Sequence, residues 1–266
     1  MDRRRFAQAV AALALAGCER DKPHPGEVTL AAAASLRFVL PVLSRAFEAG
    51  NAVPGVDPPP PMARPTTRVV ATYGASGDLK KQVEGGAPVD AVILAAARPV
   101  DDLIAGRHVE AASRVVLATN GLVLIGPRGG KPVTFATLDA LPPGERIAVG
   151  DPGAVPAGDY ARTWLRSLGK WDALQGRLVL GGDVAAVLAY ARRGEVAAAI
   201  VYRTDTHGID DVVVLDEARG PGAPRAEVVG AVVRGARAAA GAGAFLAFAG
   251  SVGGRRIFGD FGFGPP

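Results

Sequence analysis

The apolar residues of this chain follow two alternating spacings. Short apolar runs bounded by glycine, proline or polar residues have the length of buried strands; they lie at 28–30, 68–73, 89–96, 121–126, 146–150, 196–202, 212–215 and 226–235. Segments with helical spacing lie between or after them, at 36–47, 79–84, 100–105, 160–168, 184–193 and within 245–263. Strands that alternate with helices predict parallel or mixed sheets with helices on both faces, which is an α/β fold.

The number of these elements exceeds what one small sheet holds, so we predict two lobes. The chain has 266 residues, of which 49% are hydrophobic, enough for a large core in each lobe. We expect residues 28–118 together with 231–266 to form lobe I, and residues 119–230 to form lobe II.

The first predicted helix follows a run of alanines. Ser35 stands where this helix begins, and serine is a preferred N-cap residue, so we expect it to cap the helix. Pro41 would then lie several residues inside the helix, where its missing N–H predicts a bend. Residues 51–67 are rich in proline and predict an exposed insertion without regular structure.

The N-terminus has the pattern of an export signal. Three arginines at positions 3–5 precede an apolar segment that ends at Ala16 and is too short to span a bilayer. The ending Leu15-Ala16-Gly17-Cys18 predicts a lipobox, with residues 1–17 removed and Cys18 lipidated; the alternative is an ordinary cleavage site at residues 14–16. Export by the twin-arginine or the general secretory route stays open, and residues 18–27 predict a tether.

The charge pattern argues against a nucleic-acid partner. The formal net charge is +4, but the signal segment holds three arginines and one aspartate and so accounts for half of it. The remainder contains no basic stripe with interleaved aromatic residues, which nucleic-acid binding would require.

The sequence gives little support for an enzyme. The three histidines have no metal-ligand spacing to each other or to the single cysteine, Cys18. Ser76 lies in YGASGD, an incomplete match to the turn that carries a serine nucleophile, and no partner base is evident. We therefore predict no catalytic residues, no metal-ion ligands and no cofactor; a secreted hydrolase of phosphate or sulfate esters stays as a lesser alternative.

A different group of residues shares one feature, the start of a helix. Ser35 and Ser76 each follow a predicted strand and open a helix, and Ala157 and Val184 stand at two further helix starts. Helix N-termini present unpaired N–H groups and a partial positive charge, which favour an oxyanion. Serine at a helix start also has the ordinary interpretation of an N-cap.

Five segments of the chain resemble the molybdate-binding proteins that serve ABC importers, which have the type II periplasmic binding-protein fold. The matching segments are AAAASL, YGASGDLKKQVEGGAPVD, GDPGAVPAGDYARTWLRSLGKWDAL, GGDVAAVLAYARRGEVAAAIVY and FGDFGFG, and they follow the family's order across residues 28–264. One departure is Leu94-Ala95-Ala96, where the family commonly has a SAD-like triplet, which puts the capping of the next helix in question.

The resemblance implies a site and a function. It places the oxyanion ligands on the hydroxyls of Ser35 and Ser76, the backbone N–H groups of both serines and of Ala157 and Val184, and the hydroxyl of Tyr202. It implies a periplasmic monomer that binds molybdate, and also tungstate, in the cleft between its lobes and delivers it to an ABC permease; the lipobox adds the expectation of a lipid anchor at Cys18. Sulfate or another small anion is the alternative ligand.

Overall fold

The computed structural model describes residues 26–50 and 68–266. The predicted signal segment, Cys18, most of the tether and the proline-rich insertion lie outside the described residues.

One mixed sheet of nine strands runs through the protein, in the order β2-β1-β3-β9-β4-β7-β5-β6, with β8 paired to β4. The strands are β1 (Glu27–Ala33), β2 (Arg68–Gly74), β3 (Ala91–Leu94), β4 (Val115–Pro127), β5 (Ile147–Gly150), β6 (Leu178–Gly181), β7 (Ala198–Tyr202), β8 (Val212–Glu217) and β9 (Arg225–Val232).

Helices cover both faces of this sheet. The α-helices are α2 (Val39–Glu48), α3 (Ser76–Glu84), α4 (Ala97–Ala105), α5 (Pro156–Ser167), α6 (Trp171–Leu174), α7 (Val184–Arg192), α8 (Ala239–Ala249) and α9 (Val252–Asp260). Short 3-10 helices are η1 (Ala34–Leu36), η2 (Ala111–Ser113), η3 (Phe135–Ala140), η4 (Gln175–Arg177) and η5 (Arg203–Thr206). In the described ranges no helix is both long and apolar enough to cross a membrane.

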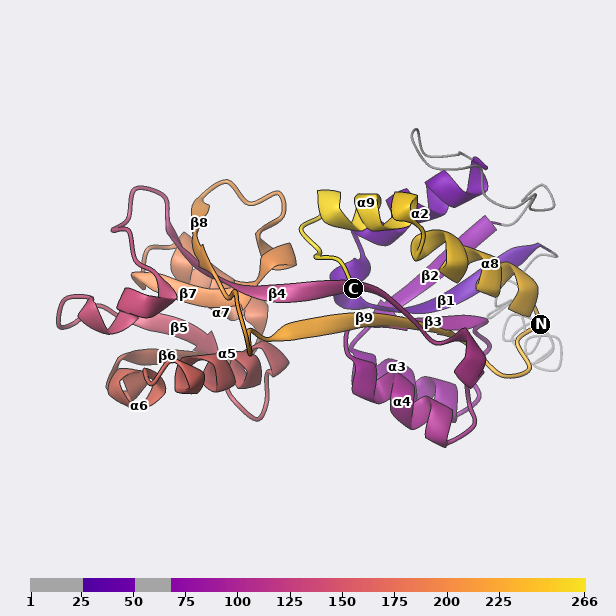
Figure 1. Cartoon of the computed structure of the whole chain (residues 1–266), viewed down its shortest axis with the longest axis horizontal. Coiled ribbons are helices and arrows are strands. Elements are labelled where there is room, and N and C mark those ends of the chain that lie inside the picture. The colour runs from indigo at the N-terminus through magenta and orange to yellow at the C-terminus, as the bar shows by residue number, and fades with distance from the viewer. Residues whose placement is uncertain (1–25, 51–67) are drawn as a thin grey trace, which may run out of the picture.

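The sheet divides into two lobes because β4 changes its partners along its length. Its first part, from Val115 to Gly121, pairs with β9, whereas Leu122–Ile125 pair with β7 and Val123–Pro127 with β8. Figure 1 shows β4 and β9 as the long connection between a lobe with α2, α3, α4, α8 and α9 and a lobe with α5, α6 and α7. The predicted two-lobed α/β fold is confirmed.

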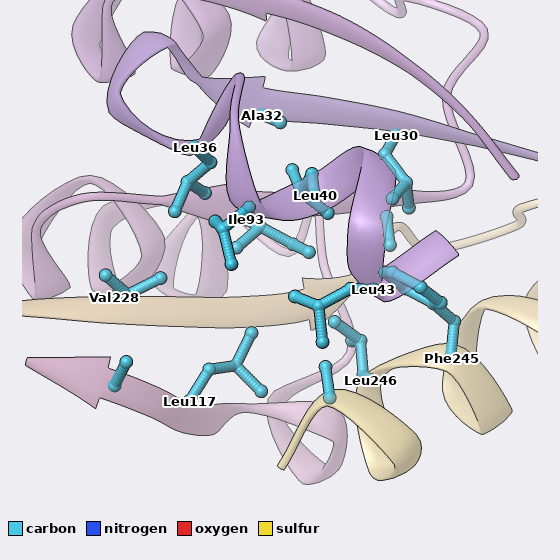
Figure 2. Close-up of a cluster of buried hydrophobic side chains, with 14 of the residues drawn as sticks. Leu30, Ala32, Leu36, Leu40, Leu43, Ile93, Leu117, Val228, Phe245 and Leu246 are labelled. Atoms are coloured by element: carbon cyan, nitrogen blue, oxygen red, sulfur yellow. The ribbon is translucent and has the colours of Figure 1, made fainter. Parts of the chain in front are cut away.

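Each lobe has an apolar core on both faces of its part of the sheet. In β3, Ala91 and Ile93 join the cluster under α2 and α8, while Val92 and Leu94 join the cluster under α3 and α4. This division follows from the two-residue repeat of a strand. Figure 2 shows the first of these clusters, where Leu43 of α2 points toward Leu117 of β4 and Leu246 of α8.

The first helix begins later than the sequence predicts. Ser35 lies inside the 3-10 turn η1, and α2 starts at Val39 after Phe38, so Ser35 does not cap α2. Pro41 consequently falls in the first turn of α2, where its missing N–H leaves no intrahelical hydrogen bond unmade, and the reason to expect a bend disappears.

Two further local results concern capping and strand detection. The N-cap of α4, Ala96, makes no side-chain hydrogen bond, as its departure from the family triplet suggested. Strand β6 was missed in the sequence, because it has four residues and stands at the edge of the sheet, with Leu180 half exposed.

A buried carboxylate joins three elements of lobe I. Asp90 is 3% exposed and accepts hydrogen bonds from the Thr29 N–H (2.8 Å), the Thr29 hydroxyl (2.8 Å) and the Ala238 N–H at the start of α8 (2.9 Å). Burial acts to raise the pKa of Asp90, but these hydrogen bonds and the charge of Arg237 outweigh it and lower the pKa below its usual value.

Replacement of Asp90 by alanine should lower the free energy of unfolding at pH 7 by about 2–3 kcal/mol, because it leaves two N–H groups without an acceptor. A lowered carboxyl pKa stabilises the fold above the unfolded-state pKa, so the difference between variant and wild type should shrink as the pH falls below about 4. Urea unfolding at pH 7 and at pH 3.5 measures it. The exposed Asp78→Ala variant serves as the control, and an equal loss in both variants would contradict the role of Asp90.

Candidate functional site

The two predicted serines lie together at one edge of the sheet in lobe I. Strands β1 and β2 are parallel, and their last residues, Ala33 and Gly74, are register partners. Ser35 follows the first of these by two residues in η1, and Ser76 follows the second by two residues at the start of α3. The structure therefore brings these two hydroxyls to neighbouring strand ends.

The two hydroxyls differ in their hydrogen bonds. The Ser76 Oγ accepts the Ala95 N–H at 3.2 Å, which fixes the serine relative to the end of β3. The Ser35 Oγ is buried and has no hydrogen-bond partner within the described residues. A buried hydroxyl without a partner is costly, so this atom is suited to a bound ligand.

Two helix starts lie together in lobe II. Strands β5 and β6 are parallel with Gly150 and Gly181 as register partners; α5 follows the first strand and α7 the second. Ala157 is buried and is the second residue of α5, directly after Pro156. Val184 is the first residue of α7. The first N–H groups of an α-helix have no intrahelical acceptor, so both residues offer backbone donors.

Glycine allows α5 to approach the sheet closely. A Cβ atom on Gly158 would clash with the carbonyl oxygen of Gly150 at the end of β5, which is backbone and cannot rotate away. The absence of a side chain at Gly158 thus sets the distance between the start of α5 and the end of β5.

Tyr202 ends β7, beside β5. Its ring lies at 6.4 Å from the ring of Tyr160 in an edge-on arrangement. Burial raises the pKa of the Tyr202 hydroxyl, and the nearby Tyr160 and Asp205 raise it further. The hydroxyl therefore stays protonated at neutral pH and remains a hydrogen-bond donor.

The strand directions make the predicted ligand residues of lobe I face those of lobe II. Strand β4 runs from lobe I into lobe II. Strands β3 and β4 are both antiparallel to β9, so they run in the same direction, and β1 and β2 are parallel to β3. Strand β7 is antiparallel to β4 and parallel to β5, and β6 is parallel to β5, so these strands run toward lobe I. The carboxyl ends of the parallel strands in each lobe, followed by the predicted ligand residues, thus face the other lobe.

Charged residues also follow these strand ends, among them Arg37, Asp151, Asp183 and Arg203. Asp78, in the first turn of α3, is exposed and pairs with Lys81 at 3.8 Å, so it faces solvent. No group of three or more histidine, cysteine, aspartate or glutamate residues suited to a metal ion occurs in the parts of the chain that the structure describes. The arrangement offers neutral donors and helix N-termini, which suit an anion.

Two cavities lie elsewhere, and none of the five predicted ligand residues lines either of them. One, of about 450 Å³, lies between the C-terminal residues and strands β4 and β8, and the other, of about 720 Å³, lies in lobe I near His108.

Sequence reasoning missed two polar residues near the site. Asp205 accepts the Tyr202 N–H at 3.0 Å, and the buried Asn120 of β4 donates to the Thr204 hydroxyl at 2.8 Å. The signals were present as an aspartate three residues after Tyr202, which is a capping spacing, and as an asparagine within an apolar strand.

Comparison with known proteins agrees with this architecture. The profile of the family described as "Bacterial extracellular solute-binding protein" matches residues 28–264. The "Molybdate-binding protein ModA" of Escherichia coli (strain K12) is 34% identical over 216 residues, which cover 79% of this chain and 77% of that protein. The "Putative ABC transporter substrate-binding lipoprotein YvgL" of Bacillus subtilis (strain 168) is 31% identical over 220 residues, covering 80% and 79%.

A solved structure is also similar over almost its whole length. The "substrate binding domain of putative molybdenum ABC transporter from Clostridium difficile" has a TM-score of 0.78 and 28% identity, covering 90% of this chain and 99% of that one. Two lobes joined by shared strands, with facing helix N-termini, define a two-lobed α/β binding protein. The chain belongs to the bacterial extracellular solute-binding protein family.

Proposed function

We propose that this protein binds molybdate outside the cytoplasm and delivers it to an ABC importer. The observation that carries the proposal is the facing arrangement of two sets of strand ends, with the unpartnered Ser35 hydroxyl on one side. The similarity to proteins named as molybdate-binding supports the choice of ligand.

The proposed ligands are the hydroxyl and N–H groups of Ser35 and Ser76, the N–H groups of Ala157 and Val184, and the Tyr202 hydroxyl. Micromolar affinity requires about 8 kcal/mol of binding free energy. Five to seven hydrogen bonds to a charged oxyanion, at roughly 1.5–3 kcal/mol each, supply this against the costs of desolvation and lobe closure. Helix ends also provide partial positive charge at the anion. The site therefore does not require a cationic side chain.

The donor set also determines which anions fit. Monohydrogen phosphate carries a proton that needs an acceptor; the four backbone N–H groups of the proposed site cannot accept it, and only the three hydroxyls could, so the site disfavours this anion. Molybdate, tungstate and sulfate are fully ionised, and cavity size separates sulfate from the two larger anions. We propose that tungstate binds as well as molybdate.

The proposal extends to partners and location. Closure of the two lobes on the anion, as a hinge at β4 and β9, would create the surface that a permease recognises. We propose that the protein is a monomer held at the membrane through lipidated Cys18. We propose that residues 28–118 and 231–266 form lobe I and that residues 119–230 form lobe II.

Calorimetric titration of the mature protein with molybdate, tungstate, sulfate and phosphate tests the proposal. We expect micromolar or tighter affinity for the two larger anions and at least tenfold weaker binding of sulfate and phosphate. Preference for sulfate would identify the alternative ligand, and turnover of an aryl phosphate or sulfate would favour the hydrolase.

A further inference from the structure

The 3-10 helix η5 lies where the lobes meet. It follows Tyr202 directly, and Asn120 of the hinge strand β4 holds it through the Thr204 hydroxyl at 2.8 Å. Its C-terminal neighbour His207 packs its ring at 4.7 Å from the ring of Phe261, which follows α9 in lobe I. A change in the angle between the lobes therefore shifts the position of η5 and of Tyr202, which directly precedes it.

Asp205 in η5 is a half-buried carboxylate without a cationic partner. It accepts the Tyr202 N–H at 3.0 Å but forms no ion pair with any lysine, arginine or histidine of the described residues. Burial raises the pKa of Asp205 to about 6, and the Tyr202 N–H and the charge of Arg37 only partly oppose this rise. An ionised carboxylate in such a place is unfavourable until a cation approaches it.

Arg37 is a cation of lobe I that follows one of the strand ends facing lobe II. It ends η1, two residues after Ser35, and its side chain is exposed to solvent. Its guanidinium lies 4.8 Å from the centre of the Phe38 ring and makes no ion pair within residues 26–50 and 68–266. Its positive charge lowers the pKa of Asp205. Arg37 follows the carboxyl end of β1 and Asp205 follows the carboxyl end of β7, and these strand ends face each other across the two lobes.

We propose that Arg37 and Asp205 form an ion pair between the lobes when the lobes close on the anion, and that this pair positions Tyr202. The inference rests on the proposed function, because each residue lies within one turn of a proposed anion ligand, Ser35 or Tyr202. Since the strand ends of the two lobes face each other, closure shortens the distance between Arg37 and Asp205. Pairing neutralises the half-buried carboxylate in the closed state alone and so stabilises that state.

A double-mutant cycle on the full mature protein tests the pair. Molybdate affinity is measured by calorimetry at pH 8 for wild type, Arg37→Gln, Asp205→Asn and the double variant. Asparagine keeps an acceptor for the Tyr202 N–H, so Asp205→Asn removes the charge and retains the backbone contact. We expect each single variant to bind threefold to tenfold more weakly, and the double variant to bind no more weakly than the weaker single variant.

Arg45→Gln is the matched control, because Arg45 is another exposed arginine of lobe I and lies in α2. It should leave the affinity within a factor of two. An equal loss in Arg45→Gln and Arg37→Gln would show general attraction of the anion and overturn the pair. Additive losses in the cycle would overturn it as well.

The same variants at pH 5 separate pairing from a structural role. Asp205 is mostly protonated there, so the loss caused by Arg37→Gln should disappear. The groups that act on Asp205 are Arg37 and Tyr202, with Tyr160 beside Tyr202. If protonation of Asp205 is the cause, the Arg37 effect must be independent of pH in the Asp205→Asn background. A loss that persists at pH 5 overturns the pair, whereas a wild type that binds none of the four anions overturns the proposed function itself.

Discussion

Molybdate affinity should fall at least tenfold when Ser35 is replaced by alanine, while the melting temperature does not fall. The Ser35 Oγ is buried without a partner in the described structure, so its removal breaks no hydrogen bond of the protein. In the complex it would donate to a charged oxygen, a bond worth roughly 1.5–3 kcal/mol, or more than a factor of ten in affinity.

Ser76→Ala should reduce the affinity by a similar factor but also lower the stability, because the Ser76 Oγ accepts the Ala95 N–H. The double variant should lose at least about a hundredfold, if the two bonds contribute separately. Calorimetry and thermal unfolding measure both effects. Ser167→Ala, whose hydroxyl donates to the Trp164 carbonyl in lobe II, is the control, and unchanged affinity in both Ser35→Ala and Ser76→Ala would contradict the site.

Gly158→Ala should destabilise the protein by about 4 kcal/mol and weaken anion binding in whatever fraction stays folded. The new Cβ would clash with the backbone of Gly150, so α5 must move away from β5 and take the Ala157 N–H with it. Far-ultraviolet circular dichroism in urea measures the stability, and calorimetry measures the affinity.

The same substitution in an open position gives the opposite expectation. A Cβ on Gly243, inside α8, meets no atom within 4 Å, so Gly243→Ala should stabilise the fold by about 0.5–1 kcal/mol. Equal effects at positions 158 and 243 would show that close packing of α5 is not what Gly158 provides.

Much of the fold was predictable because its signals are local. Buried strands such as AVIL at 91–94 are continuous apolar runs, and helices such as α7 begin after an aspartate cap and stop before Gly194. Strand β6 escaped because four residues at a sheet edge give no such signal. The start of α2 was placed too early because Leu36 fits a helical spacing although it belongs to a separate 3-10 turn.

By itself, the sequence determined the alternation of strands and helices, the two-lobed α/β class and the five residues proposed to bind the anion. The tertiary structure decided what depends on groups distant in the chain: that the Ser35 hydroxyl has no partner among the described residues, that Gly158 touches Gly150, and that the strand ends followed by Arg37 and Asp205 face each other. Spacing along a chain records which residues share a helix face or a strand, because those repeats are fixed by backbone geometry. It does not record which side chains meet across two lobes, because strand order and direction set those distances.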